Sequence, residues 1–148
     1  MSAPHIRPAP YLAEPRVTRR DDGALILTNP WPMRPAFRFV WEPLVHWARE
    51  TPDATWLAAW TGQGWAPLSY ADGWARVQAL AAGLIARIGS DRRIAILSGN
   101  SLAHAVLTYA AALSGGSVAV ITPAYSTAAT TPDRLRAALA ACRADAVW

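Results

Sequence analysis

The feature that most limits how this chain can fold is a long segment without charged residues. Between Arg93 and Asp133 the sequence contains no Asp, Glu, Lys or Arg, a span long enough to cross a lipid bilayer. Residues 114–117 (SGGS) and then 122–123 (TP) divide this segment into a helical part and a strand-like part. Neither part reaches the roughly 20 apolar residues of a spanning helix. The segment therefore predicts a buried helix and strand of a soluble sheet.

Strands and helices are predicted to alternate from residue 94 onward. Residues 94–97 form a short apolar run typical of a strand covered on both faces, and a helix follows over 102–113. A second buried strand is expected at 118–121, then a helix opened by Pro132 and Asp133, then a strand from residue 145. This order predicts right-handed crossovers and a parallel sheet. Because parallel sheets usually have more strands and helices on both faces, we expect this sheet to be incomplete.

The preceding region predicts two helices and a hairpin. Apolar spacing indicates a helix over 42–50, and residues 56–60 and 65–68 read as strands joined by a glycine-containing turn. Ser69 is placed to cap a long helix, and Gly89 is placed where a left-handed cap would end it. The tryptophans of this region are expected to form a core between the hairpin and two helices: Trp41, Trp47, Trp56, Trp60, Trp65 and Trp74.

The amino-terminal residues have a different character. Residues 1–40 are rich in Pro and Arg, and their one clear signal is a turn at Asp22-Gly23 that leads into a short strand at 24–27. We therefore divide the chain into an extended lead-in with a short strand (1–40) and an incomplete α/β subdomain (41–148). The apolar side chains of the lead-in are expected to pack on another surface.

Composition excludes several classes of protein. The 53% hydrophobic and 16% charged residues are typical of a globular chain, and the net charge of +4 comes with no dense basic run, so we expect no nucleic-acid partner. A single cysteine, Cys142, cannot form an intrachain disulfide, and residues 1–10 contain no signal-peptide pattern. We expect a cytoplasmic location and no membrane partner.

No short motif identifies a catalytic centre. Residues 99–103 (GNSLA) lie between a strand and a helix, as in a hydrolase nucleophile turn, but the only later histidine is His104 on the same helix. Ser101 is better explained as a helix cap. The chain has no Lys, which excludes a Gly-Lys-Ser/Thr phosphate loop, and His5 and His46 have no metal-ligand partners. We predict no catalytic, cofactor-binding or metal-binding residue in this chain.

Five short segments nevertheless occur in a recognisable order. They are 19–27 (RRDDGALIL), 46–53 (HWARETPD), 68–72 (LSYAD), 96–101 (ILSGNS) and 123–126 (PAYS). Their order and spacing resemble the start of the AMP-binding, adenylate-forming acyl-CoA synthetases, and specifically the feruloyl-CoA synthase type. The resemblance covers residues from about 19 to 126 and is lost at 127–133.

The resemblance implies an acid-CoA ligase and an α/β fold belonging to the large amino-terminal domain of such enzymes. Full-length members use ATP, Mg²⁺ and CoA to activate a carboxylic acid, here an aromatic one, through an acyl-adenylate. Their phosphate loop ending in Pro-Lys, their Tyr-Gly-x-Thr-Glu and Thr-Gly-Asp segments and a carboxy-terminal lysine have no counterpart in this sequence. We therefore expect an amino-terminal fragment, inactive alone, whose partner is the remaining part of the enzyme.

Three residues of the matched region are candidates for a pocket wall. Asn100, Pro123 and Tyr125 follow the carboxyl ends of predicted parallel strands, where open α/β sheets bind their ligands. Simple turn and strand-end roles are the alternative for each of them. The alternative for the whole chain is a free-standing small α/β binding or interaction domain.

Overall fold

The computed structural model describes residues 14–30, 37–127 and 132–148, and the chain divides into two compact units. In the first unit, residues 1–36, the described residues 14–30 form an antiparallel hairpin made of β1 (Arg16–Arg19) and β2 (Leu25–Thr28). Its turn is stabilised by Asp22, whose carboxylate accepts a hydrogen bond of 3.0 Å from the Ala24 N–H, and by Gly23 at φ 83°. The predicted turn is present, and the strand before it was not predicted.

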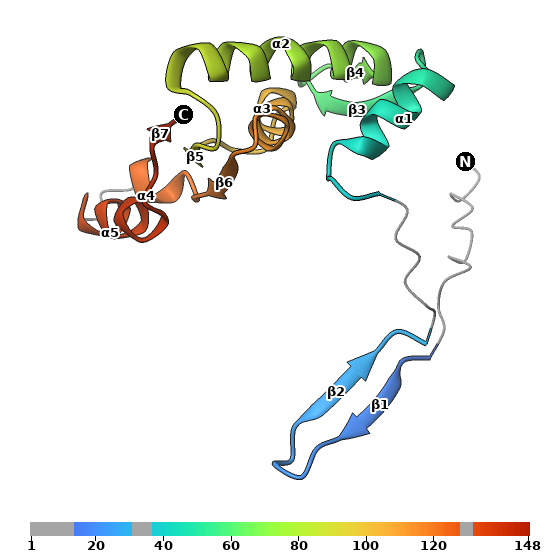
Figure 1. Ribbon diagram of the computed structural model, residues 1–148, viewed down its shortest axis with the longest axis vertical. Helices are drawn as coiled ribbons and strands as arrows, with labels where there is room; N and C mark the ends of the chain where they lie inside the picture. The colour runs from blue at the N-terminus through green and yellow to red at the C-terminus, as the bar shows by residue number, and fades with distance from the viewer. Residues whose placement is uncertain (1–13, 31–36, 128–131) are drawn as a thin grey trace. The chain divides into compact units, whose positions relative to one another are not determined.

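The second unit, residues 37–148, begins with two helices and a second hairpin (Figure 1). Helix α1 (Glu42–Glu50) precedes strands β3 (Thr55–Trp60) and β4 (Trp65–Ser69), which pair only with each other in the described part of the chain. Helix α2 (Tyr70–Ile88) follows at once. These elements lie where the sequence predicts them, because a proline, a glycine turn and a serine cap mark their ends.

Serine hydroxyls begin the two longest helices. The Ser69 Oγ accepts from the Asp72 N–H at 3.1 Å and starts α2, and the Ser101 Oγ accepts from the His104 N–H at 3.1 Å and starts α3 (Leu102–Leu113). At the end of α2, Gly89 has φ 86° and ψ 172°. Its φ is positive as expected, but its extended ψ differs from the predicted left-handed cap.

The remaining elements form a parallel sheet with the strand order β6-β5-β7. Strand β5 (Arg93–Ile96) is central and pairs in parallel with both β6 (Ser117–Val120) and β7 (Ala146–Val147). The short helix α4 (Ala124–Thr127), which was not predicted, and α5 (Pro132–Cys142) join β6 to β7. Figure 1 shows α2 and α3 on one side of these strands and α5 on the other. The predicted α/β class with a parallel sheet is therefore confirmed.

Two clusters of buried side chains hold the second unit together. The first joins α1, β4, α2 and α3 through Leu44, Leu68, Val77, Ala81, Val106 and Ala110. The second packs α3 on the central strand through Ile94, Ile96, Leu107 and Ala111. Each large aliphatic side chain removed from water in this way contributes about 1.5–3 kcal/mol.

An ion pair fixes strand β7 to the central strand. Asp145, just before β7, accepts hydrogen bonds from the Arg93 backbone N–H at 2.8 Å and from its guanidinium Nε at 3.3 Å. These bonds and the adjacent positive charge hold the pKa of the Asp145 carboxyl below its ordinary value. The contact joins residues 52 positions apart in the sequence.

Not all of the predicted tryptophan core exists. Trp56 and Trp74 pack against the first cluster, and Trp56 meets Tyr109 edge to face with ring centroids 5.1 Å apart. Trp47, Trp60 and Trp65 are instead 43%, 59% and 68% exposed, so the prediction was wrong for these three. Trp60 and Trp65 lie at the turn end of the hairpin, where they pair with each other across the strands at a centroid distance of 5.6 Å.

Candidate functional site

The carboxyl ends of β5 and β6 point to the same edge of the parallel sheet. From β5 the chain continues through α3 to β6, and it then returns through α5 to β7 on the other side of β5. The connection that follows β5 and the connection that follows β6 therefore leave the sheet on opposite sides. In open α/β sheets ligands bind at this place, so the side chains that follow β5 and β6 are the candidates for a binding site.

A serine and histidine pair lies just beyond the central strand. The Ser98 Oγ and the His104 Nδ1 are 3.0 Å apart in a partly buried hydrogen bond. The backbone of His104 is also fixed on both sides, because its N–H donates to Ser101 and its carbonyl accepts from Thr108 at 3.0 Å. Three hydrogen bonds thus hold this histidine at the first turn of α3.

The other ring nitrogen of His104 is available for a ligand. In residues 14–30, 37–127 and 132–148, no hydrogen bond to Nε2 is formed. When the Ser98 hydroxyl donates to Nδ1, Nε2 carries the proton and is a donor, and in the opposite tautomer it is an acceptor. The pair can therefore orient a polar group of a bound molecule.

The same geometry disfavours nucleophilic catalysis. The Ser101 hydroxyl is occupied as the cap of α3, which confirms the capping role and leaves no nucleophile turn at this residue. The Ser98 and His104 pair has no carboxylate hydrogen-bonded to the imidazole within the described segments. A base oriented by a third group is what a hydrolase triad requires.

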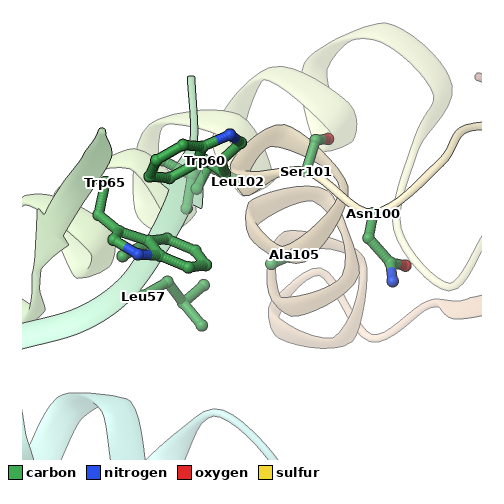
Figure 2. Close-up of a pocket in the computed structure, with 9 residues that line it drawn as sticks. Leu57, Trp60, Trp65, Asn100, Ser101, Leu102 and Ala105 are labelled. Atoms are coloured by element: carbon green, nitrogen blue, oxygen red, sulfur yellow. The ribbon is translucent and has the colours of Figure 1, made fainter. Parts of the chain in front are cut away.

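Asn100 lies in an open groove of about 380 Å³ next to this edge. Figure 2 shows the indoles of Trp60 and Trp65 on one side of the groove and α3, with Leu102 and Ala105, on the other. Asn100 is at the far end from the two indoles. The groove is mainly apolar, and Asn100 and Ser101 supply its polar side chains at one end.

The three candidate pocket residues are only partly brought together. Asn100 follows β5 and Pro123 follows β6, so both lie at the predicted edge, and Tyr125 is in the first turn of α4. The groove that Asn100 lines includes neither Pro123 nor Tyr125. Their role as pocket walls stays a prediction.

Sequence reasoning missed the Ser98 and His104 pair. The available signal was a serine directly after a buried strand and a histidine in the first turn of the next helix. The contact depends on the path of the loop 97–101, which no local pattern specifies.

Among the described residues there is no cluster of three or more His, Cys, Asp or Glu side chains suited to a metal ion. Nor does any helix in those ranges combine the length and apolar character needed to span a membrane.

Comparison with known proteins adds a family and a fold. Residues 44–148 match the family described as AMP-binding enzyme. A crystal structure titled IdnL1 is similar over 74% of this chain and 22% of its own length, with a TM-score of 0.61 and 23% identity. A crystal structure titled CmiS6 is similar over 79% of this chain and 30% of its own length, with a TM-score of 0.61 and 21% identity.

These matches differ in what they establish. At such identities the two structures support the fold alone, and the chain spans less than a third of the length of either. A comparison with curated protein sequences found no match. The family match covers residues 44–148, most of the second unit, and is the comparison that identifies the family.

Proposed function

This chain belongs to the AMP-binding enzyme family, and from that premise we propose that it is the amino-terminal part of an ATP-dependent acid-CoA ligase. The observation that carries the proposal is the family match over residues 44–148. The finer assignment, a feruloyl-CoA synthase type acting on an aromatic acid, is supported by the five segments between residues 19 and 126. We further propose that the enzyme works in the cytoplasm.

The proposed reaction has two steps. A carboxylate oxygen of the acid attacks the α-phosphorus of ATP, pyrophosphate leaves, and an acyl-adenylate forms. The thiolate of CoA then attacks the acyl carbon and AMP leaves. Both steps develop charge on phosphate oxygens, which fixed cations and backbone N–H groups must stabilise.

In our proposal the phosphate-binding groups come from the remaining part of the enzyme. The lack of lysine in this chain supports that division, because the phosphate loop of the resembling family ends in Pro-Lys. In our proposal the chain contributes the β5 and β6 edge of the large domain, where Asn100, Pro123 and Tyr125 form part of a pocket wall and His104 presents Nε2.

Acid-dependent exchange between ATP and pyrophosphate tests the proposal. The purified chain would be assayed alone and mixed with a polypeptide that supplies the remaining part of a feruloyl-type ligase. We expect no exchange from either polypeptide alone and exchange with ferulate or coumarate from the mixture. Exchange by the chain alone would contradict the inactive-part assignment, and a folded mixture that is silent with every acid would contradict the ligase assignment.

A free-standing binding domain is the second candidate. The observation in its favour is that unit 37–148 contains its own buried clusters, with Val77 and Ile96 fully removed from solvent. A monodisperse monomer with one cooperative thermal transition above the usual range of about 45–65 °C would favour this reading. A poorly stable chain that the remaining polypeptide stabilises would favour the ligase part.

A further inference from the structure

The free edge of strand β3 borders the groove that contains Asn100. Four consecutive residues of β3, 57–60, line this groove together with Trp65 and the start of α3. Successive side chains of a strand point to opposite faces of its sheet, so a wall made of consecutive residues is the edge of the strand. Leu102 and Ala105 of α3 form the opposite wall (Figure 2). We call this site the β3–α3 groove.

The turn of the hairpin shows which backbone groups face the β3–α3 groove. The Thr61 N–H donates to the Gly64 carbonyl at 2.9 Å, so these two residues are a hydrogen-bonded pair. Hydrogen-bonded pairs and unbonded pairs alternate along an antiparallel ladder. Trp60 and Ala58 are therefore in unbonded pairs, and their N–H and C=O groups point away from β4. In the part of the chain that the structure describes, no third strand pairs with them.

The two outer edges of the hairpin differ in how they are protected. Pro67 lies opposite Ala58 and has no N–H, so the outer edge of β4 lacks a donor at this position. Strand β3 contains no proline, and no charged residue lies between Asp53 and Asp72. Proline and charged side chains are what usually prevent an exposed edge from pairing with another strand. The edge of β3 is therefore the one that is open to pairing.

We propose that the β3–α3 groove binds an extended strand of the polypeptide that supplies the remaining part of the enzyme, an inference that rests on the proposed function. The backbone of this strand pairs with Ala58 and Trp60, because only an extended polypeptide carries N–H and C=O groups at the matching spacing. Its side chains on one face contact Leu102 and Ala105. No charged residue lines the groove, so the strand that fits it is uncharged.

The source of the strand follows from the proposed division of the enzyme. The chain spans 22% and 30% of the lengths of the two similar structures, so most of such an enzyme lies outside it. The β3–β4 sheet has two strands in the described segments, and both are used in pairing with each other. A third strand on the β3 edge therefore comes from another part of the enzyme in this proposal.

Hydrogen exchange of backbone amides tests this inference. The full chain is measured by NMR alone and mixed with the polypeptide that supplies the remaining part of a feruloyl-type ligase. We expect the amides of Ala58 and Trp60 to exchange at least about tenfold more slowly in the mixture, because each gains a hydrogen-bond partner. The amides of Leu57 and Ala59 are the internal control, because they already face β4 and should change less.

Two substitutions separate the two edges of the hairpin. Ala58→Pro removes the outward N–H of β3 and leaves the bonded pairs with β4 in place, so it should weaken association with the remaining polypeptide at least about fivefold in calorimetric titration. Pro67→Ala is the matched control, since it adds an N–H to the edge of β4 and should leave the affinity unchanged. Should Ala58→Pro fail to fold, Ala105→Leu narrows the groove from the α3 side and should weaken association in the same way.

Several results would overturn the proposal. They are fast exchange of Ala58 and Trp60 in a mixture that associates, unchanged affinity of the Ala58→Pro or Ala105→Leu variant, and no association between the two folded polypeptides. Slow exchange of both amides in a dimer of the chain alone would also overturn it, because a second copy would then occupy the edge.

Exchange between ATP and pyrophosphate is measured on the same mixtures. A mixture that is active while the amides of Ala58 and Trp60 stay unprotected contradicts this docking site and leaves the proposed function intact. A mixture that protects both amides and is silent with every acid supports the docking site and contradicts the ligase assignment.

Discussion

At the scale of single residues, two glycines of one helix have opposite roles. Gly73 and Gly83 both lie inside α2, where alanine is intrinsically favoured over glycine by up to about 1 kcal/mol. Gly83 is exposed with open space around it, whereas Gly73 is buried directly against the ring of Trp56. The contact with Trp56 therefore explains why a glycine is present at position 73.

The same substitution at both positions tests this difference. Gly83→Ala should raise the free energy of unfolding by about 0.5–1 kcal/mol. Gly73→Ala should lower it by about 1–3 kcal/mol, because the added methyl group overpacks the Trp56 contact. Urea denaturation of both variants measures the two values. Stabilisation by both would mean that Trp56 moves aside without cost.

At the same scale, the Asp145 carboxyl predicts an acid-sensitive contribution to stability. Its pKa is lower in the folded chain than its unfolded value of about 3.9, chiefly because Arg93 hydrogen-bonds to it. The folded state therefore binds this proton less readily than the unfolded state does. The stabilisation is fully present above about pH 4 and is lost as the pH falls through the folded pKa.

Replacing Asp145 tests the direction of this effect. Asp145→Asn should unfold more easily near pH 6 and show less further destabilisation than the wild type as the pH falls below 4. Asp53→Asn, which removes an exposed carboxylate after α1, is the control and should follow the wild-type profile. Denaturant titrations at a series of pH values give both curves. An unchanged profile for Asp145→Asn would show that the pair with Arg93 is not maintained in solution.

At the scale of elements, most of the second unit could be predicted because its signals are local. Ser69 and Ser101 cap their helices with their own hydroxyls, and Pro52 directly follows the last turn of α1. A buried strand such as β5 is likewise recognisable in the sequence as a run of a few apolar residues. The parallel direction of the strands followed from their alternation with helices, whereas the strand order β6-β5-β7 was not predicted.

The elements and contacts that were missed depend on distant residues. Strand β1 has no apolar alternation of its own and exists through pairing with β2. Ser98 meets His104 only because the loop after β5 turns back over the start of α3. Hydrophobicity alone could not separate Trp56, which contacts Gly73 of α2 and Tyr109 of α3, from Trp60 at the exposed turn end of the hairpin.

At the scale of the whole molecule, the exposed tryptophan pair predicts self-association. Trp60 and Trp65 form an apolar patch beside the groove that contains Asn100. Replacing both with threonine should lower light scattering of the purified chain, while the free energy of unfolding should change by no more than about 1.5 kcal/mol, the value of an aromatic pair.

A third tryptophan of the same hairpin supplies the control. Trp56→Thr removes a ring that packs against the first cluster and Tyr109, so it should cost about 3–5 kcal/mol of stability. It should not relieve association, because the exposed pair remains. If the double variant scatters light as strongly as the wild type, association occurs through another surface, such as the apolar strands of the β1–β2 hairpin.

The ion pair across 52 residues also has a consequence for the order of events during synthesis. The β3–β4 hairpin joins neighbours in the chain and can close as soon as it leaves the ribosome, whereas β7 follows the central strand β5 only after α3, β6, α4 and α5. Until β7 has been synthesised, at least one edge of β5 is unpaired, and its backbone N–H and C=O groups on that side can accept a strand from another nascent chain. The interval between the translation of residues 96 and 146 is thus the period in which this fold is most exposed to mispairing.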